Sequence, residues 1–217
     1  MKKNNSKSKL EPPSLIEENI LSSHGYKSIA GIDEAGRGAL AGPVVAAAVI
    51  LPRLVEHPGF KDVRDSKETS PAKRELLYSL IMDEAVAIGV GIVSPQTIDS
   101  INILNATRLA MRQSIEQLAC SPDFLLIDGM AIPRLSIRQK SIVKGDKLCL
   151  SIACASIVAK VTRDRIMVEL NESYPNYGLV RHKGYGTKHH LVCLTQHGPS
   201  PIHRFSFAPV RETFRLI

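Results

Sequence analysis

The sequence predicts an α/β domain in which helices cover a central β-sheet. Short apolar runs bounded by glycine, proline or acidic residues are typical of buried strands, and segments with a 3.6-residue apolar period lie between them. Such alternation of strands and helices favours a layered α/β architecture. The 217 residues are 44% hydrophobic and 23% charged, and no shift in composition divides residues 25–217 into two domains.

Local signals set the expected elements. Serine-proline pairs and single Asn or Thr residues supply helix caps at Ser70-Pro71, Ser94-Pro95, Asn105 and Thr187. The expected strands cover residues 28–33, 44–51, 85–93, 124–128 and 136–143. The expected helices cover residues 13–22, 70–84, a short segment from 94, 105–118, 150–170 and 187–198. Residues 144–147 are expected to form a turn and residues 175–186 a loop. The core-facing side chains of the first two helices are expected to be Leu15, Ile16 and Ile20, then Leu76, Leu77, Leu80 and Ile81.

The chain is basic. Its formal net charge is +7 and its pI is about 9.3, which favours a polyanionic partner. Four lysines within the first nine residues carry more than half of this excess, so residues 1–24 are expected to form a basic flexible tail followed by a short helix.

No apolar run approaches the roughly 20 residues that a bilayer-spanning helix needs, and no apolar segment follows the basic N-terminus. We therefore expect a cytoplasmic monomer without membrane attachment. The four cysteines, Cys120, Cys149, Cys154 and Cys193, lack Cys-x-x-Cys spacing and are expected to be reduced.

The segment 28–51 carries the first chemical signal. An apolar run ends in two adjacent acids, Asp33 and Glu34, and a loop with Gly36, Arg37 and Gly38 follows. Buried carboxylates are costly unless they are paired or bind a cation, and glycine N–H groups beside a guanidinium suit a phosphate. A dinucleotide-binding loop would require a helix directly after the glycines, but Pro43 and a β-branched run indicate a strand.

Further acids follow later strands. Asp128 ends the run 124–128, and Asp146 lies in the turn before the long helix. Acids at strand ends, together with a phosphate, suit Mg²⁺. Asp164 competes with Asp146, but it lies thirteen residues, or about 20 Å of helix, beyond Ser151. We prefer Asp146, because it precedes a helix N-terminus, and we interpret Asp164, between Arg163 and Arg165, as an ion-pair residue.

A basic and aromatic cluster occupies residues 181–190 and includes Lys183 and Tyr185. It is interpreted either as a solvated turn or as an electrostatic and stacking platform for nucleic acid. A zinc site at His189 and His190 is disfavoured, because adjacent side chains on a helix diverge.

Taken together, these segments resemble the ribonuclease HII family, the bacterial type 2 ribonucleases H. The match runs from about Tyr26 to the C-terminal region, and the order of its motifs is very specific. A Gly-Arg-Gly loop, rather than Gly-Lys-Gly, separates the chain from the sister ribonuclease HIII, and Cys154 replaces a frequent alanine. The motifs are Gly31-Ile-Asp33-Glu34-Ala-Gly36-Arg37-Gly38, Asp65-Ser66-Lys67, Ile127-Asp128-Gly129, Lys144-Gly145-Asp146, the stretch 151–165, His182-Lys183-Gly184-Tyr185-Gly186-Thr187 and His203-Arg204-Phe-Ser206-Phe207.

The resemblance implies a ribonuclease H-like fold with a mixed sheet and a C-terminal helical region. It implies hydrolysis of RNA in RNA–DNA hybrids and cutting 5′ to single ribonucleotides in duplex DNA, leaving 3′-hydroxyl and 5′-phosphate ends. It also implies two Mg²⁺ or Mn²⁺ ions and the following site residues. The metal-holding and catalytic residues would be Asp33, Glu34, Asp128 and Asp146, and the substrate-binding residues would be Gly36, Arg37, Gly38, Ser66, Lys67, Lys183 and Tyr185.

Two other functions remain open on the residues alone. One is a catalytically silent nucleic-acid-binding module, which has no need for clustered acids. The other is a different metal-dependent nuclease, or a transposase-like enzyme, built on the same acids.

Overall fold

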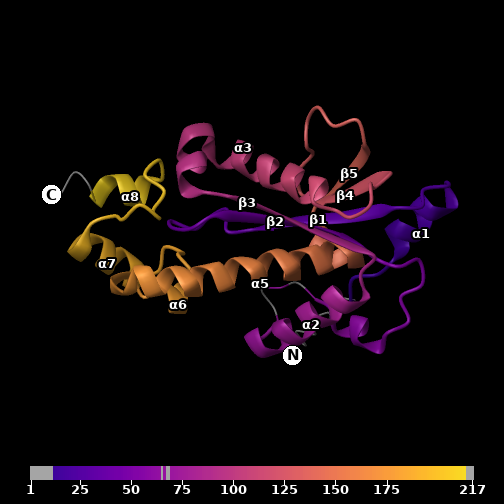
Figure 1. The fold of residues 1–217 in the computed structure, drawn as a ribbon, viewed down its shortest axis with the longest axis horizontal. Coiled ribbons are helices and arrows are strands. Elements are labelled where there is room, and N and C mark those ends of the chain that lie inside the picture. Colours follow the sequence, from indigo (N-terminus) through magenta and orange to yellow (C-terminus); the bar gives the residue numbers. More distant parts are fainter. Residues whose placement is uncertain (1–11, 65, 67–68, 214–217) are drawn as a thin grey trace, which may run out of the picture.

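A computed structural model describes residues 12–64, 66 and 69–213. A five-stranded sheet forms its centre, with helices on both faces and a group of short helices at one end (Figure 1). The predicted fold class is therefore confirmed. The expected basic tail falls mostly on residues 1–11, which lie outside the described residues.

The sheet is mixed, with strand order β3-β2-β1-β4-β5. The chain first forms an antiparallel meander of β1 (Ile29–Ala35), β2 (Val44–Ile50) and β3 (Ala87–Val93). It then adds β4 (Phe124–Asp128) and β5 (Arg138–Ile142), both parallel to β1. Every residue of β2 is buried, as expected for a continuous apolar strand in the middle of a layered domain.

Two long helices cover the two faces of this sheet. Figure 1 shows α3 (Pro95–Glu116) on one face and α5 (Leu150–Ser173) on the other, with α2 (Pro71–Glu84) packed outside α5. The remaining elements are α1 (Ile16–Ser23), η1 (Pro58–Asp62), α4 (Gly145–Leu148), η2 (Pro175–Tyr177), α6 (Leu179–His182), α7 (Lys188–His197) and α8 (Ala208–Thr213). Among the described residues, no helix has the length and apolarity that crossing a membrane requires.

Glycines in the strands let the helices approach closely. A Cβ on Gly91 of β3 would lie 1.9 Å from the carbonyl oxygen of Ala110 in α3, and one on Gly31 of β1 would lie 2.2 Å from the backbone of Ser151 in α5. The aliphatic core has one cluster on the α3 side and another on the α5 side. The small strand residues therefore determine how tightly the layers pack.

The predicted helix starts are confirmed where a side chain caps the helix. Ser70, Ser94 and Thr187 each accept a hydrogen bond from the backbone N–H three residues later. Asn105 does not cap a helix. The break in α3 lies at Asn102, which has φ 65° and accepts a hydrogen bond from the Asn105 N–H. Either asparagine could adopt the left-handed conformation and cap the following helix, so the prediction placed the break three residues too late.

Tertiary contacts overturn the predicted face of the first helix. Ile16 and Ile20 are 64% and 47% exposed, while the carboxylate of Glu18 is buried, where it accepts hydrogen bonds from the Ser151 N–H and hydroxyl. Glu18 thus caps α5, an interaction that local periodicity does not reveal.

Three further expectations are corrected. Leu76 of α2 is 74% exposed, whereas Leu77 and Ile81 are buried. The expected turn at 144–147 instead contains the start of the short helix α4, and the expected loop at 175–186 contains η2 and α6. These short helices have no apolar period long enough to detect.

We expect Gly91→Ala to destabilise the fold by about 1–3 kcal/mol, because the new methyl group would overlap the α3 backbone. Thermal unfolding measures this effect. Ile92→Ala on the same strand is the control, since Ile92 is 48% exposed and its change should matter little. Equal losses for the two variants would contradict the packing argument.

Candidate active site

Two of the predicted acids lie side by side because of strand pairing. β1 and β4 are parallel, with Ile32 opposite Ile127, so Asp33 and Asp128 follow at the same edge. The Asp33 side chain is buried and accepts a 2.7 Å hydrogen bond from the Glu34 N–H through Oδ1. Burial, then the neighbouring carboxylates of Glu34 and Asp128, raise the pKa of Asp33 well above its usual value.

Asp146 joins this group through its neighbour Gly145. The Gly145 N–H donates a 2.7 Å hydrogen bond to Oδ1 of Asp128, which fixes the start of α4 against the end of β4. Asp146 is the next residue and is buried. The structure therefore brings the start of α4 to the strand end that carries Asp33 and Asp128.

These carboxylates suit a divalent cation by their chemistry. Hard cations such as Mg²⁺ and Mn²⁺ prefer oxygen ligands, and buried like charges require a positive counterpart. Among the described residues, no three or more acidic, histidine or cysteine side chains already form a metal-binding group. Asp33 and Asp128 are each held by a backbone N–H in this structure.

A pocket of about 350 Å³ opens beside the acids. It contains Glu34, the glycine loop, Ser66 and Tyr185, all expected as site residues. Ser66 lies within the active region because its hydroxyl is 3.0 Å from that of Ser156, which in turn hydrogen-bonds Asp33. The lining residues are Glu34, Ala35, Gly36, Arg37, Gly38, Ser66, Ser156, Lys160 and Tyr185.

The glycine loop has the geometry that its sequence suggests. Gly36 has φ 94°, and a Cβ there would lie 2.0 Å from Nε of Arg163, so only glycine fits. Arg37 is exposed and forms a 3.2 Å ion pair with Glu34. The guanidinium group therefore projects at the rim of the pocket, beside the acids.

Two buried arginines fix this loop from behind. Arg163 donates to the carbonyl groups of Ala41, Pro43 and Lys183 at 2.9–3.0 Å. Arg204 donates to the carbonyl groups of Arg37 and Gly42 at 2.9–3.1 Å. Burial lowers the pKa of Arg204 to about 9, with the charge of Arg163 as the next cause.

Tyr185 lines the pocket and follows a glycine with a left-handed backbone conformation. Gly184 has φ 81°, and Tyr185 pairs with Ala39 of the glycine loop in an antiparallel bridge. The charged groups of Lys160 and Arg163 lie 5.7 and 5.3 Å from the centre of its ring. The ring thus lies between the glycine loop and two cations.

Two of the three histidines of the basic cluster are buried, so this part of the cluster is not a solvated turn. His182 and His190 are buried and stacked, with ring centres 4.5 Å apart, and Nε2 of His190 lies 3.0 Å from Nε2 of His203. Nδ1 of His190 faces the Tyr185 carbonyl, so it must carry a proton; its Nε2 then accepts from His203, whose Nδ1 accepts from the Ser200 N–H. A directional chain of neutral histidines thus supports the backbone of Tyr185.

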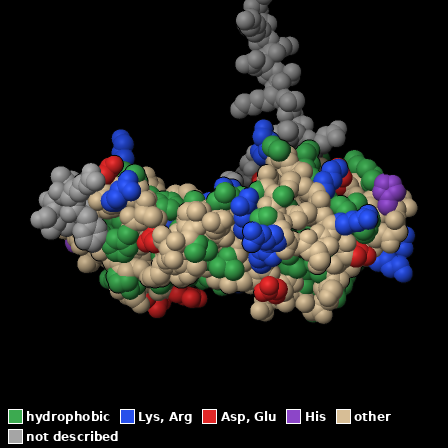
Figure 2. Space-filling view, turned by 90° about the horizontal axis from the view of Figure 1, so that it is seen from above, with side chains coloured by type: hydrophobic (Ala, Val, Ile, Leu, Met, Phe, Trp, Pro, Cys, Tyr) green, Lys and Arg blue, Asp and Glu red, His purple; other side chains and the backbone are tan. Residues whose placement is uncertain are grey.

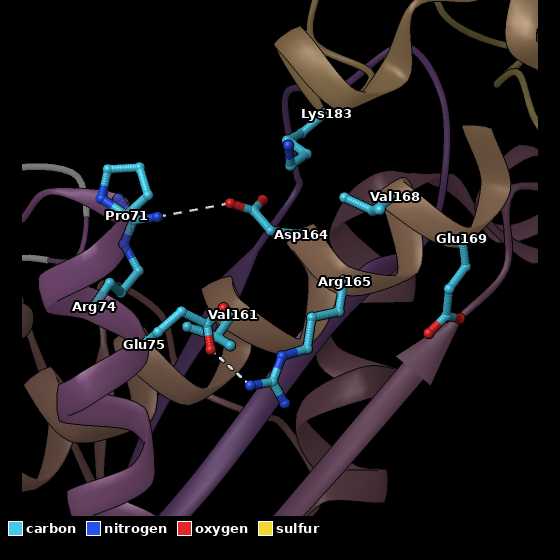
Figure 3. A pocket seen from close by; sticks show the side chains of 9 residues that line it. All are labelled: Pro71, Arg74, Glu75, Val161, Asp164, Arg165, Val168, Glu169 and Lys183. Carbon is cyan, nitrogen blue, oxygen red and sulfur yellow. Dashed lines mark hydrogen bonds and ion pairs between the residues drawn. The ribbon is translucent and has the colours of Figure 1, made fainter. Parts of the chain in front are cut away.

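Asp164 lies away from the other acids, in a second pocket of about 410 Å³ between α2 and α5 (Figure 3). Its carboxylate is 2.6 Å from Nζ of Lys160 and 3.7 Å from Arg74. The ion-pair interpretation is confirmed, but the partners are not its sequence neighbours: Arg163 binds carbonyl groups, and Arg165 pairs with Glu75 at 2.6 Å.

The remaining expected substrate-binding residues are divided between regions. Lys183 lines this second pocket, not the first, and its ammonium group donates to the Val180 carbonyl. Lys67 lies outside the described residues. Ser156 and Lys160 were not singled out from sequence, although their i, i+4 spacing on α5, with Arg163 three residues further, indicates one shared helix face.

One known protein family matches most of this chain. The family described as Ribonuclease HII matches residues 30–210. The chain belongs to the ribonuclease HII family. It is 54% identical over 205 residues to ribonuclease HII of Dehalococcoides mccartyi strain 195, covering 94% of this chain and 97% of that one. The predicted resemblance is confirmed, and the chain is an enzyme of the ribonuclease H type.

Solved structures agree with the fold. Ribonuclease H2 from Pyrococcus horikoshii OT3 superposes with a TM-score of 0.72 at 26% identity, over 88% of this chain and 98% of that one. Bst ribonuclease HIII, solved in complex with Mn²⁺, has a TM-score of 0.68 at 19% identity, over 90% and 72% of the two chains.

The histidine chain predicts acid sensitivity in this ribonuclease HII family member. Burial lowers the pKa of both His190 and His203 from 6.5 to about 4, and the charges of neighbouring histidines add to this. Between these values the unfolded chain binds protons that the folded chain does not. Stability that is fully present above pH 6.5 is therefore lost as the pH falls towards 4, by about 1.4 kcal/mol per pH unit for each proton.

The measurement is the unfolding free energy against pH. His203→Gln should reduce the slope of the unfolding free energy against pH below pH 6.5 by the equivalent of about one proton, or about 1.4 kcal/mol per pH unit, because one group with a low pKa in the folded state is removed. His24→Gln, at an exposed histidine, is the control and should leave the slope unchanged. An unchanged slope in His203→Gln would mean that other groups control acid unfolding.

Proposed function

We propose that this chain hydrolyses the RNA strand of RNA–DNA hybrids and cuts duplex DNA 5′ to single embedded ribonucleotides, leaving 3′-hydroxyl and 5′-phosphate ends. The observation that carries the proposal is the meeting of Asp33 and Asp128 at neighbouring strand ends, beside a pocket with an exposed arginine and glycine N–H groups. Membership of the ribonuclease HII family supports the same substrate class.

In this proposal Asp33, Glu34, Asp128 and Asp146 hold two Mg²⁺ or Mn²⁺ ions. Their oxygen donors and the raised pKa of buried Asp33 support this assignment, as does the Mn²⁺ bound to the structurally similar Bst ribonuclease HIII. Such ions supply an activated water and stabilise the leaving oxygen when they are bound. Neutral Asp33 cannot serve as an anionic ligand, so cation binding and loss of its proton are coupled.

The substrate would lie in the pocket beside the acids. The backbone of Gly36, Arg37 and Gly38 approaches the ribose and its 2′-hydroxyl, which is the one group that marks a ribonucleotide. Arg37, Ser66 and Lys160 offer donors to the phosphates. Lys67 and Lys183 extend these contacts along the backbone, in keeping with the net charge of +7.

We expect Asp33→Asn and Asp146→Asn each to reduce cleavage by orders of magnitude, because each removes a ligand charge. The measurement is single-turnover cleavage of a duplex carrying one ribonucleotide, with and without Mg²⁺. Asp164→Asn is the matched control, since it makes the same chemical change outside the acid group. That variant should mainly lower the melting temperature, because Lys160 and Arg74 lose their partner.

Asp146→Asn turnover within about tenfold of the wild type, together with a loss of activity in Asp164→Asn, would identify Asp164 as the ligand instead. Cleavage that is independent of divalent cations would exclude metal catalysis altogether.

We expect Tyr185→Ala to impair cleavage at an RNA–DNA junction more than cleavage within continuous RNA. A ring packed against deoxyribose leaves no room for a 2′-hydroxyl on that nucleotide, and such a contact is worth about 1–3 kcal/mol. Tyr185→Phe keeps the ring and should be milder. The measurement is kcat/KM of both variants on both substrates, and equal losses would make Tyr185 a general positioning residue.

A further inference from the structure

A pocket of about 460 Å³ lies on the α3 face of the sheet and belongs to neither pocket described above. One wall is a stripe of α3 that carries Arg108 and Arg112, and the other is the β4–β5 connection with Arg134. We call this the arginine pocket. Figure 2 looks onto the α3 side of the molecule and shows Lys and Arg side chains gathered near its middle.

The charge of the arginine pocket is not neutralised within the described part of the chain. No acidic residue lines it, and none of its three arginines forms an ion pair with a described residue. Nε of Arg108 is buried and has no hydrogen-bond partner there either. This differs from the pocket between α2 and α5, where Asp164 and Glu75 pair with Lys160 and Arg165.

One hydrogen bond joins the two walls, and two more fix the β4–β5 wall itself. Arg112 donates a hydrogen bond across the pocket to the Pro133 carbonyl. The side-chain amide of Gln139 in β5 binds both the N–H and the carbonyl of buried Ile132, at 2.8 and 2.7 Å. Arg134 has φ 58°, a conformation that a non-glycine residue keeps only where its surroundings fix it.

Converging guanidinium groups without carboxylates fit phosphate oxygens, which accept paired N–H donors in a planar fork. Ile101 and Leu109 give the pocket an apolar surface between the charges, and Asn105 adds an amide. We propose that the arginine pocket is a second phosphate-binding site, separate from the active-site pocket. Its ligand is the phosphodiester backbone of a nucleic acid strand or a free oligophosphate, and the experiment below distinguishes these sources.

The test compares two double variants that remove the same charge. Arg108→Gln with Arg134→Gln empties the pocket of two cations, while Arg112 remains to hold Pro133. Arg53→Gln with Arg211→Gln removes two exposed arginines elsewhere and is the matched control. The probe is a fluorescein-labelled oligothymidylate of about 20 nucleotides, titrated by fluorescence anisotropy without divalent cations over a range of salt concentrations.

We expect the pocket variant to bind the oligothymidylate about 5–10-fold more weakly than the control variant, with a salt slope smaller by about 1.4 for two lost phosphate contacts. Arg108→Lys with Arg134→Lys keeps the charge without the planar fork, so it should restore the salt slope but only part of the affinity, which separates lost charge from lost folding. Cleavage of a short ribonucleotide-containing duplex should be unchanged in the pocket variant. The absence of a second phosphate site can therefore be distinguished from the absence of the proposed nuclease activity.

Tripolyphosphate, titrated by calorimetry, tests the other source. If wild-type protein binds it and the pocket variant does not, while oligothymidylate affinity stays equal to the control, the ligand is a free oligophosphate. If the pocket and control variants behave alike with both probes, only net charge matters and the second site does not exist.

Discussion

The glycine loop depends on two guanidinium groups that are fully buried yet bind backbone carbonyls. Arg163 and Arg204 together join the loop at Arg37–Pro43 to the segment before Tyr185 and to the C-terminal region. A buried charge is costly without partners, so the three carbonyl groups bound by Arg163 and the two bound by Arg204 must stay in place. Helix α5, through Arg163, and the segment between α7 and α8, through Arg204, therefore shape the glycine loop by holding its backbone.

Electrostatic balance explains the arrangement around the acids. Asp33 is buried beside two other carboxylates, and the exposed guanidinium group of Arg37 pairs with Glu34 at the rim of the pocket. Negative charge is thus concentrated at the strand ends, and positive charge is available at the rim. A divalent ion and a phosphate together would satisfy both, since the ion neutralises the acids and the phosphate meets the basic rim.

Local signals predicted what is determined locally. Ser70 and Thr187 marked helix starts because each caps its own helix. Family motifs identified the acids, but the adjacency of Asp33 and Asp128 rests on pairing between distant strands. The core face of the first helix was predicted wrongly for the same reason. Glu18 is buried there because it binds Ser151, and His190 is buried because it binds His203, and the sequence does not place these partners side by side. A buried polar side chain needs a hydrogen-bond partner, and local sequence does not reveal a partner that lies elsewhere in the chain.

The parallel pairing of β1 with β4 also orders the formation of the site in time. The antiparallel meander β1-β2-β3 is completed by residue 93, whereas Asp128 joins Asp33 only after β4 has closed a loop of about 95 residues. During synthesis the N-terminal strands emerge first. Asp33 therefore lies at the edge of an incomplete sheet until β4 and then α4 have been synthesised and have packed against it. On the proposed assignment of Asp33 and Asp128, a ribosome-bound fragment that ends before β4 would lack half of this acid pair and would not hydrolyse RNA.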